Sequence, residues 1–344
     1  MPVNSTVRAV MLGATAGLFV GCSRGPSPSF LLPSGAMHQD AAQLRSPRQS
    51  AAHHRSTDGY VYVSNRTQQG ASQLLVYPHG VRNSAPLRTV TQGLVDVGGI
   101  AVDPAGNVYV ANGRAGNVLE FAPGGTSVVH TYSVGLVHPI TVTVAAGILY
   151  VADQGNARNG YTQQVFEYPV GNGTPSIGIA GLGTPSQLNE GIAVNPLTPA
   201  TFYVSASSIT VIPPAGPCPT GSAFTVGENI DPTLWMSISL SHNEQASGLA
   251  FDADGKLYAA DPCANDIAVY SKVDYTWTYS SSVPGTFSAP LFLTVANQFL
   301  AVPSSGAASG SGYVTVIDLT GHASTVTITK QLQHPIGAAV GTGS

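Results

Sequence analysis

The sequence predicts an all-β fold, a six-bladed β-propeller made of four-stranded antiparallel blades. A short apolar strand that ends in a polar or small residue recurs six times, at residues 62–65, 109–112, 150–153, 203–206, 258–261 and 301–304. The first residues of successive copies lie 47, 41, 53, 55 and 43 positions apart. A period of about 40 to 50 residues with four strands per unit is typical of propeller blades. The 39 Gly and 25 Pro among 344 residues fit the many tight turns that such a fold needs.

The clearest repeat shows how one blade is built. Residues 99–102, Gly-Ile-Ala-Val, predict the innermost strand, whose small residues suit the crowded centre of a propeller. Asp103-Pro-Ala-Gly-Asn107 predicts a hairpin turn, followed by the second strand at 108–112 and the third at 118–123. The same turn chemistry returns at Asp252-Ala-Asp-Gly-Lys256, whereas the repeat that starts at Leu291 has lost its Asp-Gly turn.

The first repeat, which begins at Tyr60, lacks an innermost strand. Residues 334–340 at the other end of the chain resemble an innermost strand with nothing after it. We therefore expect this C-terminal strand to join the N-terminal blade and close the ring, which removes exposed sheet edges. On this reading residues 58–344 form one propeller domain.

The N-terminus predicts export. An apolar run at residues 9–20 is too short to span a membrane and fits the core of a signal peptide at residues 1–22. Phe19-Val-Gly-Cys22 resembles the bacterial lipobox, which implies that Cys22 is lipidated and becomes the mature N-terminus. The alternative is an ordinary secretory signal that happens to contain Cys22. Residues 23–57, rich in Ser, Pro, Gln, Ala and Arg, predict a disordered tether, so we expect an extracytoplasmic protein that is lipid-anchored in a bacterial cell envelope.

Two further cysteines, Cys218 and Cys263, form an even pair in a domain predicted to be exported, which favours a disulfide. The strand order opposes this, because it places the two residues at opposite ends of five-residue strands, roughly 17 Å apart. A bridge needs Cα atoms within about 7 Å. Only the insertion at residues 217–234 could bring them together, so the sequence favours unbridged cysteines and leaves the question open.

Charge excludes one class of function. Residues 56–344 contain 8 basic and 16 acidic residues, a balance of −8. This acidic balance opposes phosphate binding, and the sequence has no basic stripe, so nucleic-acid binding is not expected.

Polar residues on one face of the predicted propeller are the candidates for binding. The face carries the ends of the second strands and the loops that lead into the innermost strands. The candidate binding residues are Asn65, Asn112, Asp153, Glu190 and Asp261. The structural alternative is that the Asn and Asp residues at strand ends bond to backbone groups of their own loops. We expect a ligand to contact the loops at residues 65–72, 112–117 and 153–163, which are polar and lie on a rigid scaffold.

A metal site is the alternative hypothesis. Besides the strand-end Asn and Asp residues, the same face carries further His, Asp and Glu residues that could bind a divalent metal near the channel: Asp96, His138, Glu190, His242, Glu244 and His334. His138 and His334 each precede a proline, and a role in the turn explains them as well. The sequence contains no nucleophile elbow, cysteine cluster, phosphate loop or dinucleotide motif. The sequence therefore favours a protein without catalysis or cofactor.

The repeats resemble the NHL-repeat class of six-bladed propellers. The motifs that carry the resemblance are Gly99-Ile-Ala-Val-Asp, Gly106-Asn-Val-Tyr-Val-Ala-Asn and Gly255-Lys-Leu-Tyr-Ala-Ala-Asp. The loops after Asn112, Asp153 and Asp261 lack the Asn-Asn-Arg that is usual in this class. Members of the class include extracellular binding and sensor domains and a minority of enzymes. Asn189-Glu190-Gly191 resembles a motif of the gluconolactonase and regucalcin group, and His138, Glu190 and His334 lie at positions comparable to the central His and Glu of streptogramin lyases.

We therefore expect a lipid-anchored, extracytoplasmic binding or interaction module, acting as a sensor or scaffold through its loops. The expected partner is a protein or a glycan, and a monomer is expected. The alternatives are a metal-dependent enzyme similar to lactonases or lyases, with its site at the channel mouth, and a purely structural envelope protein.

Overall fold

The structure is a computed structural model that describes residues 59–125, 127–155, 164–180, 188–198, 202–207, 225–229, 236–239, 246–274, 276–306, 311–321 and 325–342. All of them belong to one compact unit, His53–Ser344. The predicted signal peptide at 1–22, with Cys22, and the predicted tether at 23–57 lie outside the described residues. No helix in the described part of the chain is long and apolar enough to cross a membrane.

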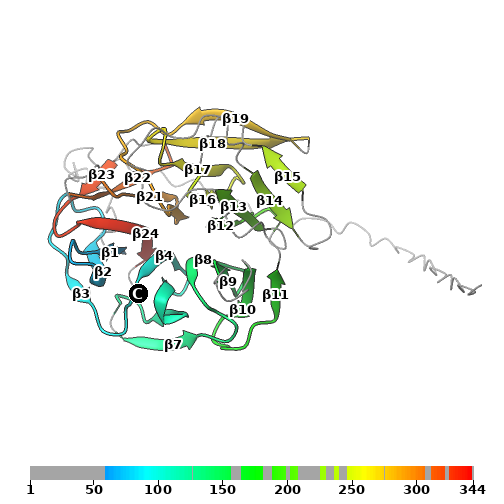
Figure 1. Ribbon diagram of the computed structural model, residues 1–344. Helices are drawn as coiled ribbons and strands as arrows, with labels where there is room; N and C mark the ends of the chain where they lie inside the picture. Colours follow the sequence, from blue (N-terminus) through cyan, green and yellow to red (C-terminus); the bar gives the residue numbers. More distant parts are fainter. Residues whose placement is uncertain are drawn as a thin grey trace, which may run out of the picture. The chain divides into compact units, whose positions relative to one another are not determined.

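The described strands form six four-stranded antiparallel sheets, which Figure 1 shows arranged around a common centre. From its innermost strand outward, sheet 1 contains β24 (His334–Thr342), β1 (Gly59–Arg66), β2 (Ser72–Pro78) and β3 (Arg88–Val90). In the same direction, sheet 2 contains β4 (Val97–Val102), β5 (Val108–Asn112), β6 (Asn117–Phe121) and β7 (Val128–Tyr132), with the 3-10 helix η1 (Gly113–Ala115) after β5. Sheet 3 contains β8 (Pro139–Ala145), β9 (Ile148–Asp153), β10 (Gln164–Pro169) and β11 (Ile177–Ala180).

The other three sheets follow the same order along the chain. Sheet 4 contains β12 (Leu188–Val194), β13 (Phe202–Ser207), β14 (Thr225–Asn229) and β15 (Met236–Ser239). Sheet 5 contains β16 (Gly248–Phe251), β17 (Leu257–Asp261), β18 (Asp266–Val273) and β19 (Thr276–Ser282). Sheet 6 contains β20 (Thr294–Ala296), β21 (Phe299–Ser304), β22 (Tyr313–Asp318) and β23 (Thr325–Ile328). The predicted all-β propeller fold of antiparallel four-stranded sheets is confirmed.

The strand β24 connects the two ends of the described chain. It pairs antiparallel with β1, from Gly59 opposite Thr342 to Arg66 opposite His334. Its inner-strand neighbours are β4 and β20, and contacts between inner strands continue through β8, β12 and β16. The innermost strand of sheet 1 therefore comes from the C-terminal end of the chain.

Neighbouring sheets are joined by apolar layers and by buried tyrosines. Between sheets 1 and 2, for example, Val76 and Leu74 pack with Val110 and Ile100. The hydroxyl of Tyr62 accepts a hydrogen bond from the backbone N–H of Gly124 in sheet 2, at 2.8 Å. Other tyrosines bridge sheets by donating to backbone oxygens: Tyr77 to Lys330 at 2.7 Å and Tyr168 to Val134 at 2.5 Å. Burial raises the pKa of all three tyrosines.

The predicted Asp-Gly turns are confirmed in sheets 2 and 5. Asp103 accepts hydrogen bonds from the backbone N–H of Asn107, at 2.8 Å, and from the hydroxyl of Tyr109, at 3.0 Å. Asp252 makes the matching bonds to the backbone N–H of Lys256 and to the hydroxyl of Tyr258, at 2.8 and 3.1 Å. In both turns the carboxylate ties the hairpin to the first tyrosine of the second strand.

The two ends of the sheets carry different connections, because antiparallel strands alternate in direction. The loop face carries the loops that lead into the innermost strands, such as 91–96 and 133–138, and the loops after the second strands, such as 113–116. The hairpin face carries the turns from innermost to second strand, such as 103–107, 146–147 and 297–298. Near the centre Ile140, Leu291, Phe292 and Ile336 form a buried apolar cluster that joins sheet 3 to sheets 6 and 1.

Candidate functional site

The candidate residues at the ends of the second strands are buried. Asn65, Asn112, Asp153 and Asp261 are exposed by 2% or less. The side-chain oxygen of Asn65 accepts hydrogen bonds from the backbone N–H groups of Gln333 and His334, both at 3.1 Å. Asn65 thus fastens the end of β1 to the loop that leads into β24.

Asn112 and Asp153 do the same in sheets 2 and 3. Asn112 accepts from the N–H of Val95 at 2.5 Å, and its amide donates to the carbonyl of Gly93 at 2.9 Å. Asp153 accepts from the N–H groups of Val137 and His138 at 2.8 and 3.0 Å. Each of these side chains therefore joins the end of the second strand to the loop before the innermost strand of the same sheet.

Asp261 bonds within its own loop, accepting from the N–H groups of Cys263 and Ala264, both at 2.9 Å. The structural alternative, bonding within the loop after the second strand, thus describes Asp261 and the bond that Asp153 accepts from the N–H of Gly155 at 2.6 Å. Asn65 and Asn112 bond instead to the backbone of the loop before the innermost strand. Glu190, the fifth candidate, lies in β12, and its side chain lies outside what the structure describes.

The metal hypothesis gains no support from the described residues. Among them, no group of three or more His, Cys, Asp or Glu side chains has an arrangement that could hold a metal ion. His138 is engaged by a carboxylate on a neighbouring sheet, while the backbone N–H of His334 bonds to Asn65.

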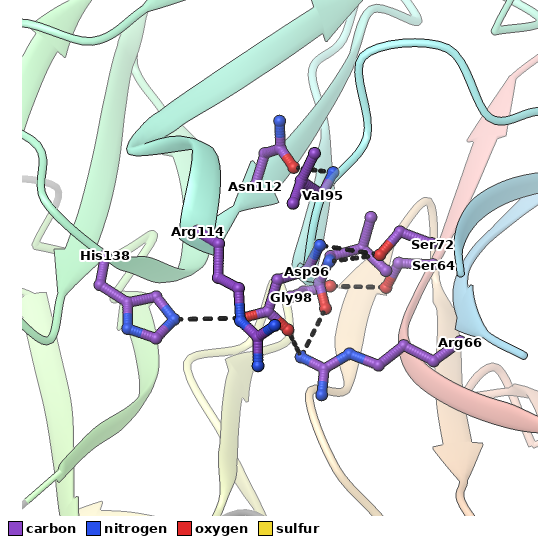
Figure 2. Close-up of polar contacts among 10 residues, drawn as sticks. Ser64, Arg66, Ser72, Val95, Asp96, Gly98, Asn112, Arg114 and His138 are labelled. Atoms are coloured by element: carbon purple, nitrogen blue, oxygen red, sulfur yellow. Dashed lines mark hydrogen bonds and ion pairs between the residues drawn. The ribbon is translucent and has the colours of Figure 1, made fainter. Parts of the chain in front are cut away.

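The structure instead brings charged side chains together around Asp96 on the loop face (Figure 2). Arg66, at the end of β1, forms an ion pair with Asp96. Arg114, in η1, lies with its Nε 3.6 Å from a carboxylate oxygen of Asp96, and His138 lies with its Nε2 3.3 Å from the same oxygen. We call these four residues the Asp96 cluster.

The backbone holds Asp96 in a fixed place. The hydroxyl of Ser72 accepts hydrogen bonds from the N–H groups of Asp96 and Val97, at 2.8 and 3.2 Å, and the carbonyl of Asp96 accepts from the N–H of Gly113 at 2.9 Å. Asp96 adopts a left-handed conformation with a φ of 67°, which is uncommon for a residue other than glycine. Sheets 1 and 2 thus both contribute to positioning this carboxylate.

A glycine lets His138 reach this carboxylate. A Cβ atom added to Gly113 would lie 2.6 Å from Cδ2 and 2.7 Å from Nε2 of His138, closer than such atoms approach in proteins. The absence of a side chain at position 113 therefore gives the imidazole ring its place beside Asp96.

The cluster carries more positive than negative charge. The hydrogen bond to His138 is the largest cause that holds the pKa of Asp96 below its usual value, and the charges of Arg66, His138 and Arg114 act in the same direction. The Asp96 side chain is 13% exposed, whereas those of Arg66, His138 and Arg114 are 39%, 38% and 78% exposed. One mostly buried carboxylate thus orients basic groups that keep contact with solvent, an arrangement able to bind an anionic group.

The sequence found only part of this cluster. Asp96 and His138 stand on the face that the repeat pattern selects, and Arg66 and Arg114 lie in the two loops, 65–72 and 112–117, where ligand contacts were expected. Neither arginine belongs to a motif. The available signal was their position directly after the second strands of consecutive repeats.

Cys263, which follows β17, is disulfide-bonded. The sequence favoured unbridged cysteines, because strand order separates Cys218 from Cys263, and for Cys263 this expectation is wrong. Its partner lies outside the described residues, as does the insertion at 217–234 on which the prediction depended, apart from residues 225–229.

Comparisons with known proteins define the fold and nothing finer. No protein-family model and no curated protein matches the chain. A chain in the crystal structure of a nidogen/laminin complex is similar, with a TM-score of 0.57 and 12% sequence identity over 83% of this chain and 99% of that one. The likeness is one of fold. A functionally unknown protein from Desulfotomaculum acetoxidans DSM 771 has a TM-score of 0.49 and 16% identity, over 80% of this chain and 83% of that one.

Proposed function

We propose that this protein is a binding module whose loop face recognises an acidic segment of a protein partner. The observation that carries the proposal is the Asp96 cluster, in which Arg66, Arg114 and His138 surround a single carboxylate on a rigid scaffold. The propeller fold, shared with a chain in the structure of a nidogen/laminin complex, is compatible with an interaction role.

The charge distribution supports this choice of ligand. Residues 56–344 hold twice as many acidic as basic residues, yet the cluster gathers two guanidinium groups beside one carboxylate. Arginine is the side chain best suited to binding carboxylates through paired hydrogen bonds. Arg114, the most exposed member, is the residue expected to reach a ligand first.

We further propose that the propeller has six blades closed by β24, and that Cys22 anchors it outside the cytoplasm through a lipid. Pairing of β24 with β1 supports closure. The disulfide at Cys263 supports export, because structural disulfides persist in oxidising compartments. Membership of the NHL-repeat class is part of the same proposal. The comparison with solved structures supports only the general propeller fold.

The experiment measures binding of a synthetic hexaglutamate peptide to the purified chain by fluorescence anisotropy. Saturable binding that weakens as salt rises is expected. Replacing Arg114 by Gln should weaken it about two- to fivefold, the scale of a solvent-exposed ion pair. Replacing both Arg66 and Arg114 by Gln should weaken it further.

The matched control is Arg82→Gln, which removes the same charge from an exposed site. Arg82 lies in the loop between β2 and β3, on the hairpin face, and should leave binding unchanged. The proposal is overturned if the peptide does not bind, or if Arg82→Gln and Arg114→Gln weaken binding equally. Binding of polygalacturonate but not of the peptide would replace a protein partner with a glycan.

A further inference from the structure

A second feature lies apart from the Asp96 cluster, inside the ring of inner strands. It is a cavity of about 580 Å³ that is lined by the innermost strands and opens beside the hairpins of the hairpin face. Phe292, which belongs to the central apolar cluster, also lines the cavity. Val144, Val194 and Val295 contribute to its walls. A cavity of this size is in the range of pockets that hold small molecules, roughly 300 to 1,000 Å³.

Polar groups with little net charge stand at the mouth. Asp254 and Lys256, on one hairpin, carry opposite charges, and both are exposed. The carboxylate of Asp252 is occupied by the N–H groups of Asp254 and Lys256 and by the hydroxyl of Tyr258. The balance favours a ligand that is uncharged at its polar end.

The hairpin between β20 and β21 contributes two amides to this mouth. Asn297 and Gln298 form a two-residue turn between Ala296 and Phe299, and both line the cavity. Their φ angles are 49° and 67°, in the left-handed region that favours glycine. This is the repeat that has lost its Asp-Gly turn.

Sheet 3 contains the same two-residue turn, with glycine at its second position. Ala146 and Gly147 connect Ala145 to Ile148 with φ angles of 49° and 77°. Gln298 therefore stands where the equivalent hairpin has glycine, and Asn-Gly would be the most favourable pair for such a turn. Residues in strained conformations are enriched at functional sites, and Gln298 combines such a conformation with a place in the cavity lining.

We propose that the cavity binds a neutral amphiphilic small molecule, whose apolar body enters between the inner strands and whose polar end hydrogen-bonds to the amide of Gln298. This site is independent of the loop face and of the binding function proposed for it. Its test therefore succeeds or fails separately.

The probe is N-phenyl-1-naphthylamine, a neutral dye that fluoresces in apolar surroundings. It is titrated into the full chain carrying Cys22→Ser, so that no acyl chain competes for the dye. One saturable site per chain is expected. Gln298→Gly should weaken the dye about three- to tenfold, the effect of one neutral hydrogen bond, while raising the melting temperature because the strained conformation suits glycine.

Two further variants separate binding from stability. Ala146→Gly relaxes the equivalent turn in sheet 3 and should raise the melting temperature without changing dye affinity. Thr143→Phe places a ring on the cavity wall and should lower dye affinity more than tenfold, with Thr131→Phe on the outer strand β7 as its control.

Several results would overturn the proposal. They are the absence of saturable dye binding, equal dye affinity in Gln298→Gly and the parent chain, and a folded Thr143→Phe variant that binds as before. If Thr143→Phe does not fold, the comparison of Gln298→Gly with Ala146→Gly decides the question alone.

Discussion

Asp153 and Asn112 occupy equivalent places at the ends of second strands, yet one is an acid and the other an amide. Asp153 is 2% exposed, and burial is the main cause that raises its pKa, against the lowering effect of hydrogen bonds from Val137, Gly155 and His138. An acid whose pKa is higher in the folded state favours folding when protonated. Its contribution is complete below the pKa of the unfolded chain and is lost as pH rises through the folded-state pKa.

The first prediction follows from that sign. As pH rises from about 4 towards 7, the stability of Asp153→Asn should increase relative to that of the unmodified chain. The reason is that Asp153 then becomes a buried charge, whereas Asn stays neutral. Below that range the variant should be less stable by about 1 kcal/mol, since the amide nitrogen cannot accept the bond from Gly155. Urea unfolding at several pH values measures both effects.

The reciprocal variant provides the control. Asn112→Asp puts a carboxylate beside the carbonyl of Gly93 and the side-chain oxygen of Asn117, which now accept from the amide. Its loss of stability should grow with pH. A pH-independent difference between Asp153→Asn and the unmodified chain would contradict the prediction.

Residue types and spacing could predict the positions of these strand-end residues but not what they contact. The repeat pattern aligned Asn65, Asn112 and Asp153, and local bonding is a known alternative for such residues. The Asp96 cluster was harder to find. It joins side chains from three sheets, Arg66, Arg114 and His138, and only the relative placement of those sheets brings them within reach of one carboxylate.

Among the elements, β24 is predicted to have a large effect on stability. It pairs with β1 and contacts the inner strands β4 and β20 of the two neighbouring sheets. Its residues Ala338 and Val340 are buried in the apolar layer between sheets 6 and 1. Removing it would expose the full edge of β1 and open the apolar layer.

Deleting residues 334–344 should therefore abolish cooperative unfolding. The lost strand hydrogen bonds, about 1 kcal/mol each, and the lost apolar burial together approach the whole stability of a typical domain, about 5 to 15 kcal/mol. Thermal unfolding followed by circular dichroism tests this. Deletion of residues 343–344 alone keeps β24 and is the control. An unchanged melting curve in the longer deletion would show that the ring closes without β24.

The hairpin turns that short sequence motifs specify were the most predictable elements. Asp103 and Asp252 set their turns through bonds to residues four and six positions later, so short motifs carry the information. The bonding of Cys263 could not be predicted in this way. The repeat gives no template for the insertion at 217–234 on which that prediction depended.

At the scale of the whole molecule, the proposal is that a lipid anchors the propeller outside the cytoplasm. The proposal assigns this role to Cys22, because an apolar run at residues 9–20 and Gly21 precede it in the order that lipoprotein processing requires. The disulfide at Cys263 fits the oxidising environment that such export implies. The predicted lipidation of Cys22 and the disulfide of Cys263 thus both fit the proposed extracytoplasmic location.

Cys22→Ser should move the protein from the membrane fraction to the soluble fraction of bacterial cells, because a serine at this position cannot accept the thioether-linked lipid. Two acyl signals hold a protein stably to a bilayer, whereas a chain without them is released. Ser23→Ala, which keeps Cys22, should remain in the membrane fraction. Mass spectrometry of the mature N-terminus identifies the modification directly. An unmodified Cys22, or cleavage at another bond, would favour the ordinary secretory signal and leave the propeller free outside the cytoplasm.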